Sequence, residues 1–432
     1  MKTTLLPVTL LTLALSLLPS RAPACGGYGT PTFTAHEWGT FTSVQGADGV
    51  QLEWNPLVAS DLPPFVHNVN RTALDPRARS YPLYLAKTAV RSLQRMETPV
   101  IYFYSDRERT VDVTVQFPQG HITEWYPQLN AESFKTPGRI TKLVWDRVTV
   151  LPRSQHPNLE AELPTHNAPS HYFPAREAEA DYLRREPAKD AKPELESLLF
   201  YRGVGYFSAP LAVSMPGGEK TLQLKNNGAE PLGNLFVLQV TGDRANFRFV
   251  ESLAPGAEQV VTLPCSRSAQ PLAEVSERLA TEMRRALVRE GLFDREAAAM
   301  VKTWRDSWFA DSGVRVLYTL PRAWTDRTLP LAITPTPQKT VHVMVGRAEV
   351  ITPAIENAVL AQLQRFISAE PAARAQIAAD TRALGLGRFL EPTVRRLAER
   401  VPAQQFSTLG WEFMTRVTAP TPAATAVATR FE

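Results

Sequence analysis

The first segment whose residue types could do chemistry is TAHEWGTFTSV (residues 34–44), in which His36 and Glu37 stand side by side. A zinc-protease helix needs a second histidine four residues after the first, and position 40 is Thr. The alternation of Thr, Phe and Trp with other residues predicts a strand, and neighbouring residues of a strand point to opposite faces. His36 and Glu37 therefore cannot bind one ion together, and we predict no metal site and no cofactor.

The pair Glu-Trp recurs at residues 37–38, 53–54 and 124–125. A Trp can stack on a sugar ring beside a carboxylate, and two carboxylates about 5–10 Å apart are the apparatus of a glycosidase. On a strand, however, such a pair favours a core Trp and a solvated Glu. The sequence also has no Ser-centred nucleophile elbow, phosphate-binding glycine loop or Cys-His arrangement, so no catalytic residue is assigned.

A second polar cluster lies in SHYFPAREAEADYLRRE (residues 170–186) and ELESLLFYRGVG (residues 194–205). Arg202 belongs to an apolar strand, and an unpaired buried charge is very costly, so it must be paired. We predict Glu177 or Glu196 as its partner, in either a structural or a ligand-binding role, with any pocket beside this pair and His36 or Glu37 on its wall. The candidate binding residues are His36, Glu37, His171, Arg176, Glu177, Glu196 and Arg202.

The elements that must position these residues follow from the apolar period. Period-two patterns run from about residue 34 to 150, with strands over 98–106 and 110–118, and return between 197 and 265. Near Pro271 the period changes to 3.6, where two helices follow, the second with Asp294 as its N-cap. We predict a multi-domain, mainly β protein of antiparallel sandwich modules, followed by an α-rich C-terminal region.

A long connection separates the two predicted β modules. It is rich in Pro, His and Glu, with one short helix expected around residues 176–185. The predicted segments are, in order, a signal peptide (1–24), a tether (25–33), an N-terminal β domain (34–150), the connection (151–196), an immunoglobulin-like β module (197–265), a mixed α/β region (270–353), a helical region (354–417) and a disordered tail (418–432).

The N-terminus is typical of an exported protein. Lys2, an apolar run over residues 5–18 and Ala22-Pro23-Ala24 form the charged region, apolar region and cleavage site of a signal peptide, cleaved after Ala24. The run is shorter than the roughly 20 residues of a transmembrane helix, and we predict none. The expected location is the periplasm, the cell envelope or the extracellular space.

Cleavage would make Cys25 the first residue, and two outcomes stay open. Small residues before a Cys favour a lipid anchor on Cys25, although Arg21 departs from the Leu-rich pattern of lipoprotein signals. Alternatively Cys25 pairs with Cys265, the one other cysteine, in an oxidising compartment. Lipidation excludes this disulfide.

The charge of the chain excludes one class of partner. Removal of residues 1–24 takes away Lys2 and Arg21 and no acid, so the formal net charge falls from +4 to +2. Nucleic-acid binding needs clustered Lys and Arg, which are absent from the sequence, and we predict no nucleic-acid partner.

Several word-like segments together resemble a family of uncharacterised secreted proteins from Gram-negative bacteria. They are HEWGTFTSV, METPVIYFYSD, GHITEWYP, HYFPAREAEAD, LLFYRGVGYF, TWRDSWF, GVRVLYTLP and VMVGRAEVITP, within residues 36–353. The resemblance implies export and a joint role for the polar residues of these segments. It implies no particular activity.

Two classes of function are compatible with these observations. The first is an exported cell-envelope protein without catalysis, which binds or scaffolds an envelope protein or a glycan. The second is an exported hydrolase, dependent on a metal or on carboxylates, with its site between the N-terminal strands and residues 171–202. Convergence of His36, Glu37, His171 and Arg202 in one cleft would favour the hydrolase, and their dispersal would favour the binding protein.

Overall fold

The computed structural model describes residues 32–57, 61–69, 90–136, 138–187, 192–263, 268–398, 401–402, 406 and 408–419. The predicted signal peptide, Cys25, Cys265 and residues 420–432 of the predicted tail lie outside these ranges. Among the described residues, no helix is both long and apolar enough to cross a membrane.

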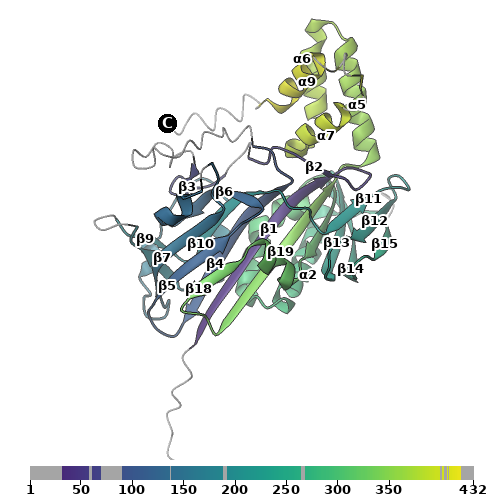
Figure 1. Cartoon of the computed structure of the whole chain (residues 1–432). Coiled ribbons are helices and arrows are strands. Elements are labelled where there is room, and N and C mark those ends of the chain that lie inside the picture. The colour runs from purple at the N-terminus through teal and green to yellow at the C-terminus, as the bar shows by residue number, and fades with distance from the viewer. Residues whose placement is uncertain are drawn as a thin grey trace, which may run out of the picture.

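An eleven-stranded sheet forms the centre of the molecule (Figure 1). Two long strands from distant parts of the chain, β1 (Phe33–Gln45) and β19 (Lys339–Val350), pair in parallel at its middle, and every other described strand pair is antiparallel. On the β1 side lie β2 (Gln51–Leu52), β4 (Gln94–Ser105), β10 (Leu199–Gly205), β6 (Gly120–Tyr126) and β3 (His67–Asn68). On the β19 side lie β17 (Gly313–Thr319), β13 (Leu232–Thr241), β14 (Arg244–Leu253) and β16 (Gln270–Pro271).

Two smaller sheets cover one face of the central sheet. The strands of both alternate apolar and polar residues, so each sheet can bury one face and leave the other wet. The apolar side chains of all three sheets form one core, which includes Phe41, Trp145 and Leu224. The first small sheet contains β18 (Leu331–Thr334), β5 (Arg109–Gln116), β7 (Lys142–Leu151), β8 (Tyr182–Arg185) and β9 (Glu194–Glu196). The second contains β11 (Leu211–Ser214), β12 (Thr221–Asn226) and β15 (Glu258–Thr262).

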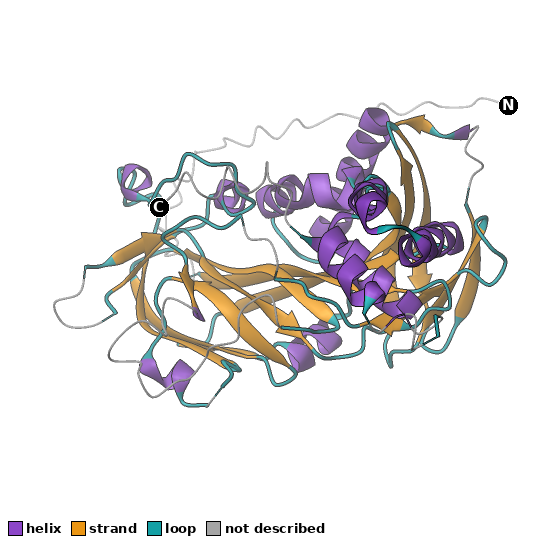
Figure 2. Cartoon of the chain, turned by 90° about the horizontal axis from the view of Figure 1, so that it is seen from above, coloured by secondary structure: helices purple, strands orange, loops and turns teal. Residues whose placement is uncertain are grey.

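Helices cover the opposite face, called the helix face below. In Figure 2 most of the helices lie on one side of the strands, and a few short helical turns lie on the other. The helices α2 (Leu272–Arg289) and α3 (Asp294–Arg305) bury their apolar stripes against the sheet, and α3 continues into a π-helical turn, η7 (Asp306–Ala310). A short 3₁₀ segment, η5 (Phe173–Ala178), packs beside α3. The helix α4 (Arg322–Thr328) lies next to β19 on the other face, where Trp324 packs against the core of the three sheets. Three further 3₁₀ turns are η3 (Ala131–Phe134), η4 (Leu159–Glu162) and η9 (Gly387–Phe389).

The C-terminal helices form a separate core at one end of the sheet, at the top of Figure 1. Apolar residues at helical spacing, such as Val359, Leu363 and Phe366, are fully buried within it. Thr352 caps the first helix by accepting a hydrogen bond from the Ile355 backbone N–H. The helices are α5 (Pro353–Ser368), the 3₁₀ turn η8 (Pro371–Ala373), α6 (Arg374–Arg382), α7 (Leu390–Ala398) and α9 (Leu409–Thr418).

The predicted fold class, mainly β with an α-rich C-terminal region, is confirmed. The predicted boundary between two β modules is wrong at the level of the sheet, because strands from residues 34–150 and 197–265 share the central sheet through the β1–β19 pair. Pairing between strands so far apart in the chain leaves no periodic signal in the sequence. The helix expected over 176–185 is instead η5 followed by β8, and Asp294 begins α3 while Phe293 holds the N-cap position.

Candidate functional site

The polar residues singled out in the sequence fall into separate groups on the two faces of the central sheet. His36 and Arg202 lie on the helix face. His36 contacts Glu296 of α3, and Arg202 meets Asp61, whose other partner, His171, stacks on Trp304 of α3. Glu37 points to the opposite face, as its place next to His36 on a strand requires, and meets Tyr201 there. The four residues whose convergence would favour a hydrolase therefore do not share one cleft.

His171 and Arg202 are brought together by Asp61, which lies outside the two polar segments singled out in the sequence. His171 Nδ1 lies 2.5 Å from Asp61 Oδ2, and the His171 backbone N–H donates to the same oxygen at 2.9 Å. Arg202 Nη2 lies 3.5 Å from Asp61 Oδ1. The Arg202 side chain is 2% exposed, against 38% for His171 and 32% for Asp61, so the cluster runs from the surface into the protein.

The electrostatics of this cluster follow from the pairing. Burial alone would raise the pKa of Asp61, but the hydrogen bonds from His171 and the charge of Arg202 outweigh it and hold that pKa well below its usual range. The hydrogen bond to Asp61 raises the pKa of His171. The imidazole also stacks on the Trp304 indole of α3, with ring centroids 5.3 Å apart and planes within 9°. Asp61 and Trp304 therefore fix the orientation of His171.

The prediction that Arg202 is buried is confirmed, and the predicted partners are wrong. Glu196 instead accepts two hydrogen bonds from Arg176, at 2.9 and 2.6 Å, and one from the Tyr172 hydroxyl at 2.8 Å. Glu177 lies on the surface, where Lys302 Nζ contacts it at 2.6 Å. Arg202 faces Glu124 across the β10–β6 pair as well as meeting Asp61.

The partner of Arg202 was predicted wrongly because burial in an apolar strand indicates that an arginine has an acidic partner, but not which carboxylate that partner is. Asp61 is 110 residues from His171 in the chain and precedes a Pro-rich segment with no periodic pattern. Glu124 could have been found from the pairing of HITEWYP with LLFYRGVG, because residues that face each other across two strands interact. Tyr201, the neighbour of Arg202 on β10, contacts Glu37 on the opposite face.

His36 belongs to a second buried cluster, under the start of α3. Its Nδ1 lies 2.7 Å from Glu296 Oε2, and both side chains are fully buried. Glu296 Oε1 accepts from the Tyr104 hydroxyl at 2.8 Å, and Oε2 also accepts from the Phe293 backbone N–H at 2.7 Å. Glu296 thus satisfies the N-terminus of α3 and ties that helix to β1 and β4.

Glu37 takes part in a chain of polar contacts on the other face. Tyr201 donates to Glu37 Oε1 at 2.5 Å, His342 Nε2 lies 3.0 Å from Glu37 Oε2, and His342 Nδ1 lies 2.9 Å from Asp326. Burial raises the pKa of Glu37, against the opposing effects of His342 and Tyr201. The chain leads from partly exposed Asp326 on α4 to the core of the sheet.

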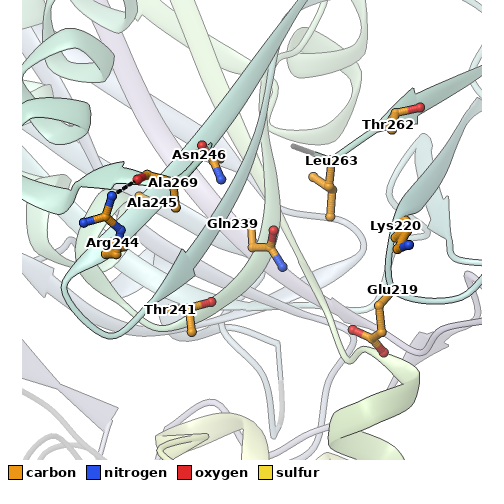
Figure 3. A pocket seen from close by; sticks show the side chains of 10 residues that line it. All are labelled: Glu219, Lys220, Gln239, Thr241, Arg244, Ala245, Asn246, Thr262, Leu263 and Ala269. Carbon is orange, nitrogen blue, oxygen red and sulfur yellow. Dashed lines mark hydrogen bonds between the residues drawn. The ribbon is translucent and has the colours of Figure 1, made fainter. Parts of the chain in front are cut away.

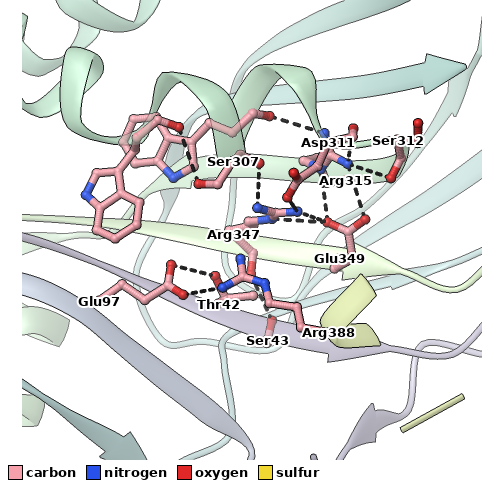
Figure 4. Close-up of polar contacts among 12 residues, drawn as sticks. Thr42, Ser43, Glu97, Ser307, Asp311, Ser312, Arg315, Arg347, Glu349 and Arg388 are labelled. Atoms are coloured by element: carbon pink, nitrogen blue, oxygen red, sulfur yellow. Dashed lines mark hydrogen bonds and ion pairs between the residues drawn. The ribbon is translucent and has the colours of Figure 1, made fainter. Parts of the chain in front are cut away.

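A row of buried charges crosses the helix face farther along the strands (Figure 4). Arg315 donates to the backbone carbonyls of Trp308 and Asp311, and Arg347 donates to that of Ser307 at 2.5 Å, so the two guanidinium groups cap the C-terminal carbonyls of η7. Glu349 accepts from both arginines. Farther along, Glu97 meets Arg388 from the C-terminal helical region at 2.5 Å and Arg95 at 3.3 Å. We call Arg95, Glu97, Glu124, Arg202, Arg315, Arg347 and Glu349 the charged belt.

A pocket of about 550 Å³ lies away from these clusters (Figure 3). It is bordered by β13 and β14 of the central sheet and by β15 of the three-stranded sheet. Gln239, Asn246 and Leu263 are among its lining residues. None of the predicted site residues lines it. The polar chemistry and this pocket therefore do not mark one common site.

The arrangement restricts the chemistry that these residues can perform. The described residues contain no group of three or more His, Cys, Asp or Glu placed to hold a metal ion. The Asp61–His171 pair has the form of an oriented base, since Asp61 holds Nδ1 and leaves Nε2 with no hydrogen-bond partner among the described residues. In the same ranges, no Ser, Thr or Cys side chain is hydrogen-bonded to His171, so no activated nucleophile stands beside it.

No model of a protein family matches the chain, and no curated protein matches it. Among solved structures, it is similar to the Fcho1 Mu homology domain of Danio rerio with bound Eps15 peptide, at 8% identity and a TM-score of 0.31 over 74% of this chain and 97% of that one. It is also similar to the yeast delta-COP-I mu-homology domain complexed with a Dsl1 WxWxV peptide, at 6% identity and a TM-score of 0.29 over 74% and 99%. At these scores the similarity carries no argument about function.

Proposed function

We propose that the chain is an exported cell-envelope protein without catalysis, which binds or scaffolds an envelope protein or a glycan. It leaves the cytoplasm through its N-terminal signal peptide and belongs with the secreted Gram-negative proteins that its segments resemble. Its mature form begins at Cys25, which carries a lipid anchor or pairs with Cys265.

One observation carries the proposal. The polar residues of the characteristic segments are matched with one another inside the protein: His36 with Glu296, Glu37 with Tyr201 and His342, Arg176 with Glu196. Such pairs hold the elements of the fold together, because a buried charge that loses its partner destabilises the fold by several kcal/mol. Side chains used in this way stabilise a framework, and the framework then presents its outer surface to a partner.

The test combines location with binding. Cells that produce a C-terminally tagged chain are fractionated, and the envelope fraction is treated with a short crosslinker in intact cells. A component that crosslinks is purified and titrated against the mature protein by calorimetry, and isolated peptidoglycan sacculi are tested in parallel by co-sedimentation. Saturable binding of either supports the proposal. Recovery in the cytoplasm with residues 1–24 retained, or a failure of both binding assays, contradicts it.

A second function, an exported hydrolase, is favoured by the Asp61–His171 pair alone. An imidazole oriented by a carboxylate can act as a general base toward water. The partial exposure of both side chains would let a substrate reach the ring.

The hydrolase is tested with chromogenic esters, phosphate esters and glycosides. Turnover that disappears in Asp61→Asn and His171→Gln, while both variants remain folded at the assay temperature, would establish it. Glu177→Gln serves as the control, because this nearby carboxylate is on the surface and contacts Lys302. Absence of turnover, or turnover that is equal in all four proteins, rejects the hydrolase.

A further inference from the structure

Two arginines at the junction of the sheet and the C-terminal helices keep buried donors without acceptors. Arg202 is 2% exposed, and its Nε and Nη1 have no hydrogen-bond partner among the described residues. Arg388, on η9, donates to Glu97 through Nη1, while its buried Nη2 has no partner in the part of the chain that the structure describes. A buried donor without an acceptor costs about 1–3 kcal/mol, and more when it is charged, so three such atoms in one place call for an explanation.

Arg202 and Arg388 both lie near one ion pair of the charged belt, Arg95–Glu97. Glu97 accepts from Arg388 and contacts Arg95, and the charges of Arg388, Arg95, Arg347 and Arg202 outweigh its burial and hold its pKa at about 2. Burial, together with the like charges of Arg202 and Arg388, lowers the pKa of Arg95 to about 10, although Glu97 opposes this. The Arg95 guanidinium is therefore close enough to those of Arg202 and Arg388 to be repelled by both.

The local charges of the described residues do not cancel when His171 is protonated. Arg95, Arg202, Arg388 and His171 supply four positive groups, and Asp61, Glu97 and Glu124 supply three carboxylates. Arg315 and Arg347 add nothing to this excess, because Glu349 and Asp311 balance them. The excess of one positive charge lies in a buried environment, where a compensating anion is worth more than in water.

The cluster also reaches the surface. Arg388 is 27% exposed, and Asp61, the neighbour of Arg202, is partly exposed as well. The cation–π contacts of the Arg388 guanidinium with the rings of Trp54 and Phe389 hold it in place from the helical side. The cluster is therefore open to the surface at Arg388 and Asp61, while the three donor atoms themselves are buried.

We propose that Arg202 and Arg388, grouped about the Arg95–Glu97 pair, form a binding site for a small free oxyanion with at least two acceptor oxygens, a phosphate or a carboxylate. The guanidinium group is suited to this ligand because it presents two parallel donors. The site lies where the C-terminal helices meet the central sheet, so its occupation would strengthen that contact. The proposal stands apart from the proposed function and does not depend on it.

The experiment measures anion binding to the mature chain by calorimetry and by the thermal midpoint, at constant ionic strength set with chloride. The probes are inorganic phosphate, acetate and vesicles that contain phosphatidylglycerol. The variants are Arg202→Gln and Arg388→Gln, and the control is Arg285→Gln, which removes the same charge from an exposed side chain paired with Glu282. Because Arg202→Gln can fail to fold, Arg388→Gln, at a partly exposed position, provides the independent test.

The expected result is saturable binding of phosphate or acetate to the wild type, at least ten-fold weaker binding to both variants, unchanged binding to the control, and no co-sedimentation with vesicles. The absence of saturable binding to either anion would overturn the proposal. Ordered water would then be the hydrogen-bond acceptor of the unpaired donors. Equal losses in Arg388→Gln and Arg285→Gln would show a non-specific charge effect. Vesicle binding that requires Arg388 would replace the free anion by a lipid headgroup.

Discussion

Replacement of Glu196 by Gln tests whether the buried polar residues of the segments singled out in the sequence stabilise the fold. The Glu196 side chain is fully buried and accepts four hydrogen bonds: two from Arg176, one from the Tyr172 hydroxyl and one from the Ser197 backbone N–H. Arg176 is itself only 12% exposed. Gln retains one acceptor oxygen, but its amide presents donors to a guanidinium that has only donors.

The expected loss follows from these contacts. The substitution removes a two-pronged charged interaction and leaves the Arg176 charge in a largely buried place. Hydrogen bonds to charged groups contribute about 1.5–3 kcal/mol each, and removing one partner of a buried pair costs about 3–5 kcal/mol. We therefore expect Glu196→Gln to lower the free energy of unfolding by about 3–5 kcal/mol.

The assay is equilibrium urea unfolding of the mature chain, followed by tryptophan fluorescence and by circular dichroism. Glu177→Gln provides a matched control: the same substitution in the same segment, at a carboxylate that is 53% exposed and pairs with Lys302. A pair this exposed contributes about 0.2–1 kcal/mol, so the control should remain close to the wild type. If the two variants lost equal stability, or if Glu196→Gln lost less than about 1 kcal/mol, the reasoning would be refuted.

Three further predictions concern pH and processing. The pKa of Glu97 is lowered from 4.5 to about 2, which corresponds to a stabilisation of the folded state by about 3 kcal/mol. This stabilisation is present above pH 4.5 and is lost as the pH falls toward 2. The difference in unfolding free energy between the wild type and Glu97→Gln, measured in urea, should therefore vanish over that range. The pKa of Glu37 is raised above 4.5, so the stability that its neutral form contributes is complete below pH 4.5 and decreases as the pH rises through the folded-state value. Glu37→Gln cannot ionise, and its urea midpoint relative to the wild type should therefore increase from pH 4 to 8; a constant difference would contradict this account. Intact-mass measurement of the exported protein should show cleavage after Ala24, and an added diacylglycerol mass would identify a lipid anchor on Cys25, whereas a full-length mass would rule out the signal peptide.

The parts of the fold that the sequence predicted are those encoded in neighbouring residues. Alternation over 98–106 and 110–118 predicted β4 and β5, and the helical period after Pro271 predicted α2 and α3. The opposite orientations of His36 and Glu37 also followed from local geometry, since adjacent strand residues always face apart. By contrast, the parallel β1–β19 pair, which unites the two predicted modules, joins strands about 300 residues apart and leaves no local pattern.

The candidate site likewise has features that the sequence predicts and features that depend on the tertiary structure. The sequence by itself determined that Arg202 is buried and must have an acid near it, because its neighbours are apolar and desolvation of a charge is costly wherever it occurs in the chain. Which acid answers that requirement was decided only by the tertiary structure: strand register placed Glu124 opposite Arg202, and loop packing brought Asp61 beside it. The physical reason is that the cost of burial depends on the local sequence, whereas the compensating Coulomb energy depends on distances in space, which only the assembled sheet and its loops fix.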